Sequence, residues 1–225
     1  MIISHKYQFI FVKTTKTAGT SIETYLSPYC GKADVFTPIF PVEPGHIPRN
    51  FGSPVPNNLA SLSMDEFRQL QTHTTYRNHM PATQIRDRVE GGVWDSYYSF
   101  CVERNPWEKA VSHYAMLLKR EQFEASFEQY CLEKRCPSDA SKWLSPGSKE
   151  ILVDRVVRYE RLHEELAELF GRLGIPFENG LNVRAKSGYR NTQTDFRKYY
   201  TNNAMIESVA SVCHREIELL GYRFS

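Results

Sequence analysis

The sequence predicts an α/β fold, with a mainly parallel central sheet flanked by helices in a single domain that spans residues 1–225. Short apolar runs rich in β-branched and aromatic residues alternate with amphipathic helical patterns along the chain. The 225 residues are 41% hydrophobic and 24% charged, which is enough apolar material for one sizeable core. There is no internal repeat and no interdomain linker, so these elements are expected to share that core.

The first unit is a strand, a polar loop and a helix close to the N-terminus. Residues 9–12 are an apolar run that predicts a buried strand, and Thr20 and Ser21 open a helix with an apolar face. The loop between them contains Lys16 and Gly19. A helix N-terminus offers unpaired N–H groups and the positive end of its dipole, so the loop predicts a site for phosphate or sulfate. An ordinary βα turn capped by a hydroxyl side chain fits the same residues.

This loop differs from the Walker A motif of nucleotide-binding proteins. In that motif a lysine directly follows the second of two glycines. Here Lys16 stands three residues before Gly19, the only glycine of the loop. A Walker A phosphate loop is therefore not predicted.

Residues 34–60 are expected to form a proline-rich loop inserted in the domain. Six of the 12 prolines lie between Pro38 and Pro56. A loop of this length in a compact domain is often a lid or a substrate wall, and a proline-stiffened surface excursion fits equally well. A short helix is expected to start near Ser63.

Two histidines, His73 and His79, precede a helix that Pro81 is expected to start. His79 would lie near the carboxyl-terminal edge of the sheet. The two histidines lack the spacing of a helical metal-binding pair and no third ligand is evident, so no metal site is predicted. Each histidine also fits a surface or structural role.

The next strand and helix place a basic residue at the same edge of the sheet. Residues 100–102 predict a buried strand, and Pro106 starts an amphipathic helix. Arg104 follows the strand, and Ser112 lies about two turns into the helix. Ligands of open α/β sheets bind outside the carboxyl ends of the strands, so Arg104 is expected to hold an anion. A salt bridge to a carboxylate is the alternative.

The rest of the chain supplies further helices, one more strand and a basic loop. The stretch between positions 184 and 198 contains five basic residues, among them Lys186 and Arg190, and one acidic residue, Asp195. A solvated surface loop would have the same composition. Apolar patterns predict three helices, at 122–135, 160–173 and 203–220, and a strand at 153–159. Residues 136–149 are rich in turn-forming residues.

Composition and charge exclude several classes of protein. The net charge of +2 gives no global polyanion-binding signature, so an anion site must be local. The five cysteines show no disulfide framework, and Cys101 in an apolar strand suggests a reduced core thiol. No segment approaches transmembrane length, and the apolar N-terminal residues are better interpreted as a strand than as a signal peptide. We therefore expect a soluble cytoplasmic protein, although a chain lacking its anchor would look the same.

Three stretches at matching order and spacing resemble the sulfotransferase family, especially its carbohydrate branch (family 2 type) and bacterial relatives. They are KTAGTS at 16–21, RNPWEKAVSHY at 104–114 and VVRYERL at 156–162, and GYRF at 221–224 resembles the family's usual ending. The resemblance covers nearly the whole chain. It implies a P-loop-kinase-like sulfotransferase fold and 3'-phosphoadenosine 5'-phosphosulfate (PAPS) as sulfuryl donor, with PAP as product.

The resemblance also implies roles for individual residues. Arg104 and Ser112 would hold the 3'-phosphate of the donor, and Lys186 and Arg190 of the basic loop would close over it. His79 lies where the carbohydrate branch often has a histidine that serves as base. The 5'-phosphosulfate would be held by Lys16, Thr17, Ala18, Gly19, Thr20 and Ser21.

These residue types also suit sulfuryl transfer on chemical grounds. The reaction should resemble phosphoryl transfer, an in-line displacement at a loose centre. Lys16 can stabilise charge on the bridging and non-bridging oxygens. A neutral His79 can take the proton of an acceptor hydroxyl, because the usual histidine pKa of about 6.5 is near working pH. The alternative bases are His73 and a carboxylate such as Glu23, and the scheme requires no metal.

The sequence thus predicts a PAPS-dependent sulfotransferase that acts on a hydroxyl of a saccharide or glycoconjugate, with no nucleic-acid partner. A P-loop-type small-molecule kinase and a non-catalytic module that binds an anion or a polysaccharide are the two alternatives. The missing Walker A order argues against the kinase, and the near-neutral charge argues against the module. Neither the identity of the acceptor nor the oligomeric state follows from the sequence.

Overall fold

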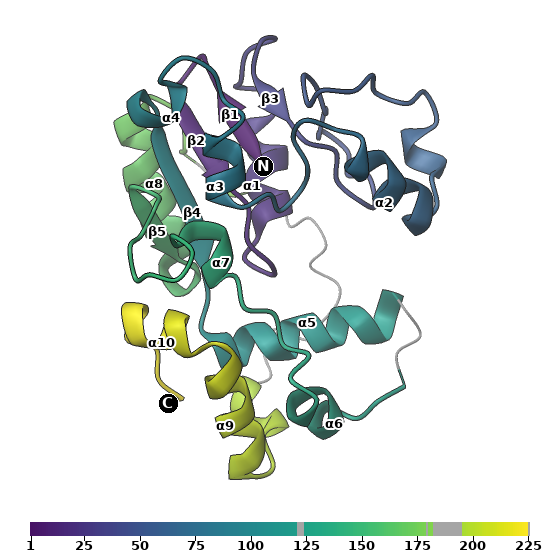
Figure 1. Cartoon of the computed structure of the whole chain (residues 1–225), viewed down its shortest axis with the longest axis vertical. Coiled ribbons are helices and arrows are strands. Elements are labelled where there is room, and N and C mark those ends of the chain that lie inside the picture. The colour runs from purple at the N-terminus through teal and green to yellow at the C-terminus, as the bar shows by residue number, and fades with distance from the viewer. Residues whose placement is uncertain (121–123, 179, 182–194, 225) are drawn as a thin grey trace.

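Figure 1 shows the computed structural model of the chain, which describes residues 1–120, 124–178, 180–181 and 195–224. Within these ranges the chain forms a five-stranded sheet with the strand order β3-β1-β2-β4-β5. The α/β class predicted from the sequence is confirmed. The strands are β1 (Ile2–Ser4), β2 (Phe9–Val12), β3 (Val35–Phe36), β4 (Tyr98–Glu103) and β5 (Arg155–Arg158).

The sheet is mixed, so the predicted mainly parallel sheet is wrong. β2 pairs in parallel with β4, and β4 pairs in parallel with β5. β1 runs antiparallel to both β2 and β3. The connection explains the difference, because residues 5–8 alone join β1 to β2 and are too few for the crossover that parallel neighbours need.

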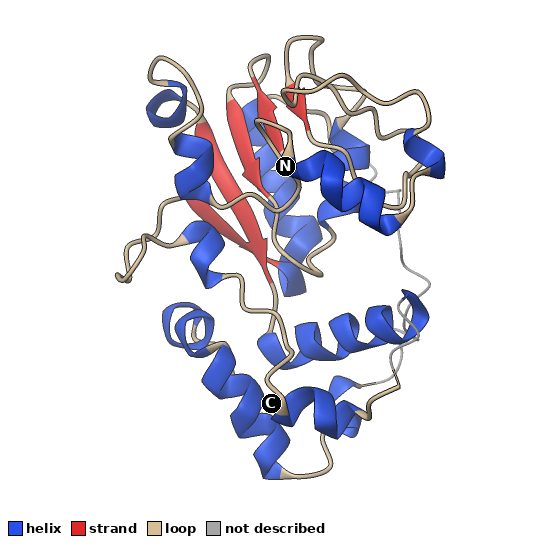
Figure 2. Ribbon diagram, turned by 45° about the vertical axis from the view of Figure 1, so that its right-hand side comes forward, coloured by secondary structure: helices blue, strands red, loops and turns tan. Residues whose placement is uncertain are grey.

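Helices cover both faces of the sheet and form a further layer beyond the carboxyl ends of its parallel strands (Figures 1 and 2). None of the helices in the described ranges is long and apolar enough to cross a membrane. The α-helices are α1 (Gly19–Leu26), α2 (Met64–Thr72), α3 (Ala82–Arg86), α4 (Val93–Ser96), α5 (Pro106–Arg120), α6 (Phe127–Leu132), α7 (Ala140–Trp143), α8 (Leu162–Leu173), α9 (Asn203–Val212) and α10 (His214–Leu220). Short 3-10 turns are η1 (Leu59–Ser61), η2 (Tyr159–Arg161) and η4 (Phe196–Tyr199).

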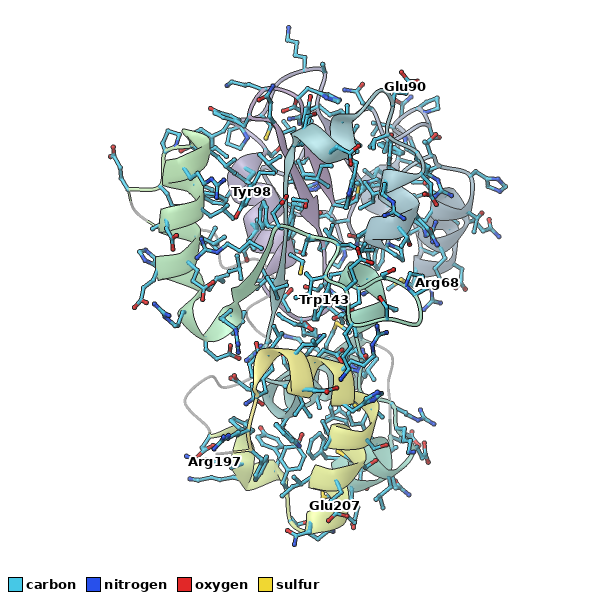
Figure 3. The ribbon with its side chains drawn as sticks, turned by 60° about the vertical axis from the view of Figure 1, so that its left-hand side comes forward. Arg68, Glu90, Tyr98, Trp143, Arg197 and Glu207 are labelled. Atoms are coloured by element: carbon cyan, nitrogen blue, oxygen red, sulfur yellow. The ribbon has the colours of Figure 1, made fainter. Side chains whose placement is uncertain are left out.

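Three clusters of buried apolar side chains hold these layers together. Ile22 of α1 and Phe170 of α8 belong to the cluster on one face of the sheet. Ile85 of α3 and Trp143 of α7 belong to the cluster on the other face, and Trp143 lies toward the helical layer (Figure 3). Val111 of α5 packs with residues of α6 and α9 in the third cluster. The helical layer therefore has a core of its own, separate from the two faces of the sheet.

Capping explains where several helices begin and end. Ser63 starts α2 with a capping box, as the sequence predicted. A second capping box at Ser126 starts α6, which is shorter than the helix expected over 122–135. The helix expected over 203–220 is instead divided at Cys213 into α9 and α10.

The proline-rich segment 34–60 contains an element that the sequence analysis did not predict. Its first residues form β3, which becomes the edge strand beside β1. Phe36 and Arg49 exchange two backbone hydrogen bonds of 2.9 and 3.0 Å, which tie the later part of the segment to this edge. The segment is thus anchored to the sheet rather than a simple insertion.

Candidate functional site

The loop between β2 and α1 lies at the carboxyl ends of the parallel strands, where the sheet meets α5 (Figure 1). Thr14 Oγ1 donates a hydrogen bond to the carbonyl of Val102 in β4 and lies 2.8 Å from Thr17 Oγ1. Lys16 and Ala18 both have a φ of 60°, in the left-handed region. These contacts and the two left-handed residues fold the loop into a tight turn against β4.

The N-terminus of α1 is accessible to a ligand. Ala18 is its N-cap residue and has no side-chain group that could cap this end, and the first turn has no acidic residue. The Thr17 and Ser21 side chains are buried, whereas Lys16 and Thr20 are partly exposed. An anion here would meet the backbone N–H groups of the first turn and the side chains of Lys16 and Thr20.

Lys13 supports this loop from inside the fold. Its ammonium is buried and lies 2.5 Å from Glu23 Oε2, and the amino group of Met1 lies 2.5 Å from Glu23 Oε1. A Cβ added to Gly19 would lie 2.8 Å from Lys13 Cγ, so the Lys13 chain fills the space beside this glycine. Although burial raises it, Lys13 and the Met1 amino group hold the pKa of Glu23 well below its usual range. Glu23 is therefore a structural anion and a poor candidate for the base.

Lys16 and Arg104 come together at this edge, as the sequence analysis expected. Arg104 Nη1 donates to the carbonyl of Lys16 at 3.4 Å. Its Nη2 donates to Glu108 at 2.7 Å, so the salt bridge considered as an alternative is also present. The guanidinium lies 4.1 Å from the ring centre of Tyr159. Arg104 Nε is buried and has no hydrogen-bond partner among the described residues, which leaves one strong donor for a ligand.

The ammonium of Lys16 lies in a positive environment. Burial, and after it the charges of Arg120 and Arg104, lower the pKa of Lys16 to about 8. A bound anion favours the charged form of such a lysine and would raise its pKa again. The loop therefore combines a helix N-terminus with cations whose mutual repulsion an anion would relieve.

Three other residues, Ser112, Lys186 and Arg190, were also predicted to bind the donor. Ser112 is partly buried on α5, and the hydrogen bonds of Arg104 in the described part of the chain go to Lys16 and Glu108 rather than to Ser112. Lys186 and Arg190 lie outside the described residues. Their predicted role stays a prediction.

His79 lies beside the base of the loop. Its Nδ1 is 3.2 Å from the carbonyl oxygen of Lys13, so a neutral ring donates from Nδ1 and keeps Nε2 as an acceptor. Burial, and then the charges of Lys142 and Lys13, hold the pKa of His79 well below its usual range. His73 is exposed at the end of α2. Of the two histidines singled out in the sequence, His79 is the one at the site.

Asp139, which the sequence analysis missed, holds the loop from the opposite side. Thr15 donates to it twice, from N at 2.8 Å and from Oγ1 at 3.0 Å. The carboxylate pairs with Lys109 at 2.6 Å and with Lys142, and Lys109 also lies 2.7 Å from Glu103. Asp139 stands in a turn-rich stretch without apolar periodicity. No local sequence signal pointed to a partner so distant along the chain.

The carboxylates of this buried network titrate differently. The pKa of Glu103 is raised to about 7, chiefly by burial; Lys109 opposes this increase, and the negative charge of Asp139 adds to it. Burial also raises the pKa of Asp139, but Lys109 and Lys142 reverse the effect and hold it well below its usual range. Glu216 supports the turn, because its Oε1 accepts from the N–H of Asp139 at 2.8 Å. Glu103 therefore titrates near neutrality beside a permanently charged Asp139.

His113 on α5 is the second residue that the sequence analysis missed. Its Nδ1 lies 2.9 Å from the hydroxyl oxygen of the buried Tyr130. Burial lowers the pKa of His113 to about 4, and the next largest cause is the charge of Lys16. His113 is therefore neutral at neutral pH and close enough to Lys16 to interact with it. The sequence signal that could have identified His113 is its position next to Ser112 in the stretch 104–114, which the sequence analysis singled out.

Neither a metal centre nor a disulfide forms part of this site. Within the described residues, no group of three or more His, Cys, Asp or Glu side chains is arranged to hold a metal ion. All five cysteines are free, and Cys101 is buried in the core.

Comparison with known proteins gives a relative without a stated activity. A protein of Archaeoglobus fulgidus, given only as an uncharacterized protein, is 35% identical to this chain over 119 residues. The aligned region is 49% of this chain and 98% of the archaeal protein. No family profile matches the chain. No solved structure matches it either.

Proposed function

The chain belongs to one family with the Archaeoglobus fulgidus protein, and we propose that it is a PAPS-dependent sulfotransferase acting on an acceptor hydroxyl. The name of that relative states no activity, so the proposal rests on the candidate site. The observation that carries it is the meeting of Lys16 and Arg104 beside the uncapped N-terminus of α1. A P-loop-kinase-like fold and a saccharide or glycoconjugate acceptor are part of the proposal.

The residues present fit a donor that carries two separated anionic groups. The buried Nε of Arg104 has no hydrogen-bond partner within the described ranges, and the pKa of Lys16 is lowered, so both groups gain from a nearby anion. The phosphosulfate would lie against Lys16 and the first turn of α1, and the 3'-phosphate near Arg104 and Ser112. Lys186 and Arg190 are the residues proposed to close over the donor.

Lys16 is the proposed electrostatic catalyst. The donor supplies a sulfuryl group on a phosphate oxygen, and that sulfur–oxygen bond breaks as a bond to the acceptor oxygen forms. The ammonium of Lys16 would stabilise the negative charge that develops on the phosphate oxygen. The N–H groups of the first turn of α1 would add dipoles aimed at the same charge.

A neutral histidine would accept the proton of the acceptor hydroxyl. His79 is the first candidate, because its Nδ1 is engaged by the Lys13 carbonyl and its Nε2 is left as an acceptor. His113 is the second, because its ring is oriented by Tyr130 and interacts with the charge of Lys16. Both imidazoles are neutral at pH 7, which is the state that a base requires.

We also propose a cytoplasmic location. All five cysteines are free thiols, including the partly exposed Cys30. A reducing compartment keeps thiols in this state.

The proposal is tested by donor binding and by sulfuryl transfer. PAP should raise the melting temperature of the purified protein more than ATP with Mg²⁺ does, and labelled PAPS should label a hydroxyl acceptor. Lys16→Ala should lower kcat by about a thousandfold and weaken PAP by far less. The exposed Lys32→Ala is the matched control and should behave as the wild type.

Two results would contradict this function. Greater stabilisation by ATP with Mg²⁺ would favour a kinase. Wild-type turnover in Lys16→Ala would remove Lys16 from the reaction.

A further inference from the structure

A polar pocket of about 450 Å³ lies at the end of the sheet opposite the Lys16 loop. Its wall includes Gln8, Tyr98 and Asp154, which stand at the amino-terminal ends of the parallel strands β2, β4 and β5. Figure 3 shows Tyr98 beside α8, away from the helical layer at the carboxyl ends of these strands. The volume is sufficient for a small organic molecule. This pocket is therefore separate from the candidate functional site.

Arg172, in the last turn of α8, supplies a positive charge to the pocket. Its guanidinium lies over the ring of Tyr98, 4.3 Å from the ring centre, and this contact restricts the positions that the long side chain can take. Among the described residues, the Arg172 side chain donates no hydrogen bond and forms no ion pair. The guanidinium therefore offers its paired N–H groups to a ligand, and this geometry matches a carboxylate.

Two carboxylates line the same pocket. Asp154 is held by Ser99, whose N and Oγ donate to Asp154 Oδ2 at 2.7 and 2.8 Å. Within the described ranges no hydrogen bond reaches Asp154 Oδ1, and the side chain of Asp95 on α4 has neither a hydrogen bond nor an ion pair. Neither carboxylate pairs with Arg172 in these ranges, although all three residues line one pocket. The pocket thus presents acceptors for a cationic group as well as donors for an anionic one.

These charges distinguish between classes of ligand. A carboxylate without an amino group would bind Arg172 but would meet the negative charges of Asp95 and Asp154. An amine without a carboxylate would leave the donors of Arg172 unused. A molecule that carries both groups satisfies all three residues. The rings of Tyr7 and Tyr97 in the same wall add flat apolar surface for the rest of such a molecule.

We propose that this pocket binds a small zwitterion, a free amino acid. The carboxylate of the ligand pairs with Arg172, and its ammonium is bound by Asp95 and by Oδ1 of Asp154. Its side chain packs on the tyrosine rings of the wall. The site goes beyond the sulfotransferase function and does not depend on it, because the pocket shares no residue with the Lys16 loop.

Ligand-observed NMR of the purified protein tests this site with the standard amino acids, β-alanine and γ-aminobutyrate. We expect at least one of them to bind with a Kd on the order of 1 mM. Analogues of the best ligand that lack one charged group should bind about tenfold more weakly, because each loses a charged hydrogen bond. For L-phenylalanine these analogues are 3-phenylpropanoate, without the ammonium, and 2-phenylethylamine, without the carboxylate.

Three variants tie the binding to the pocket. Arg172→Gln should weaken the amino acid about tenfold, and Arg172→Lys should have a smaller effect, because an ammonium keeps the charge but not the paired donors. Asp95→Asn should weaken the amino acid and leave its analogue without the ammonium no weaker. Arg161→Gln is the matched control, because Arg161 is an exposed arginine at the other end of α8, where it pairs with Glu164 at 3.1 Å. It should bind as the wild type does.

Three outcomes would overturn the proposal. The first is that none of the amino acids binds. The second is that binding is the same in Arg172→Gln and in the wild type, which would place the ligand elsewhere. The third is that an analogue with one charged group binds as tightly as the amino acid. The melting shift produced by PAP should be equal in Arg172→Gln and the wild type, so this proposal and the sulfotransferase function are tested independently.

Discussion

Removal of the Asp139 charge should destabilise the protein in a pH-dependent way. The Asp139 carboxylate is buried, accepts two hydrogen bonds from Thr15 and pairs with Lys109 and Lys142. Breaking a buried ion pair costs about 3–5 kcal/mol. In Asp139→Asn the cost should be near the lower end, because Lys109 keeps Glu103 as a partner and the Lys142 side chain is partly exposed.

The pH dependence follows from Glu103, whose native pKa of about 7 exceeds its usual 4.5. Between these values the native state binds a proton that the unfolded state has lost, so wild-type stability falls as pH rises from 4.5 to about 7 and levels off above that. The full difference corresponds to a penalty on the order of 3 kcal/mol above pH 7. Asp139→Asn removes one negative charge that raises this pKa. The substitution should therefore cost about 3 kcal/mol at pH 5.5 and about 1 kcal/mol at pH 8.

Urea unfolding followed by tryptophan fluorescence at pH 5.5 and pH 8 measures both costs. Asp154→Asn is the matched control, because Asp154 accepts hydrogen bonds of 2.7 and 2.8 Å from Ser99. It should cost about 1 kcal/mol at both pH values. A cost of Asp139→Asn that is the same or larger at pH 8 would refute the assigned coupling between Asp139 and Glu103.

Three further predictions concern the loop and its histidines. PAP affinity should fall by about tenfold per pH unit above pH 8, because the Lys16 ammonium of the unliganded protein loses its proton there. Lys16→Arg should move this loss of affinity to higher pH. Calorimetry from pH 7 to 10 measures the PAP affinity, and an affinity that does not change over this range would contradict the prediction. The rate of transfer should stay level as pH falls to about 5, since His79 and His113 both have lowered pKa values, and a loss of activity centred near pH 6.5 would argue against both. His79→Gln and His113→Gln, compared by kcat, identify the base as the variant with the larger loss. Gly19→Ala should destabilise the fold by about 2 kcal/mol, because the methyl group of the new alanine would overlap the Lys13 side chain. Thermal unfolding measures this loss of stability, with Thr20→Ala as the control.

The local parts of the site were predictable from the sequence. An apolar run, a polar loop and a hydroxyl-rich helix start gave β2 and α1 nearly at their boundaries, because each pattern is set by neighbours a few residues apart. The same holds for β4, the start of α5 and the position of Arg104. Strand ends meet at one edge of a parallel sheet, so the contact between Arg104 and the Lys16 loop followed from topology.

The missed features depend on contacts between distant parts of the chain. Asp139 and Thr15 are separated by 124 positions, and no periodic pattern links them. β3 has two residues, too few for any strand pattern to appear in a proline-rich segment. The antiparallel edge arose from the short β1–β2 connection, which the sequence analysis did not weigh. The role of His113 depends on how α5 packs near the loop, because this packing brings the His113 ring close enough to Lys16 to interact with its charge.

The contact between Gly19 and Lys13 has an evolutionary consequence. The lysine chain runs where any larger residue at position 19 would place its first carbon. Substitution at either position alone is penalised, by overlap at 19 or by the loss of the Lys13 ammonium from the buried Glu23, which then keeps the Met1 amino group as a partner. In related chains these two positions should covary as a pair, with a side chain at 19 only where 13 is short and 23 is neutral. Sequences from the archaeal family can be examined for this linked exchange.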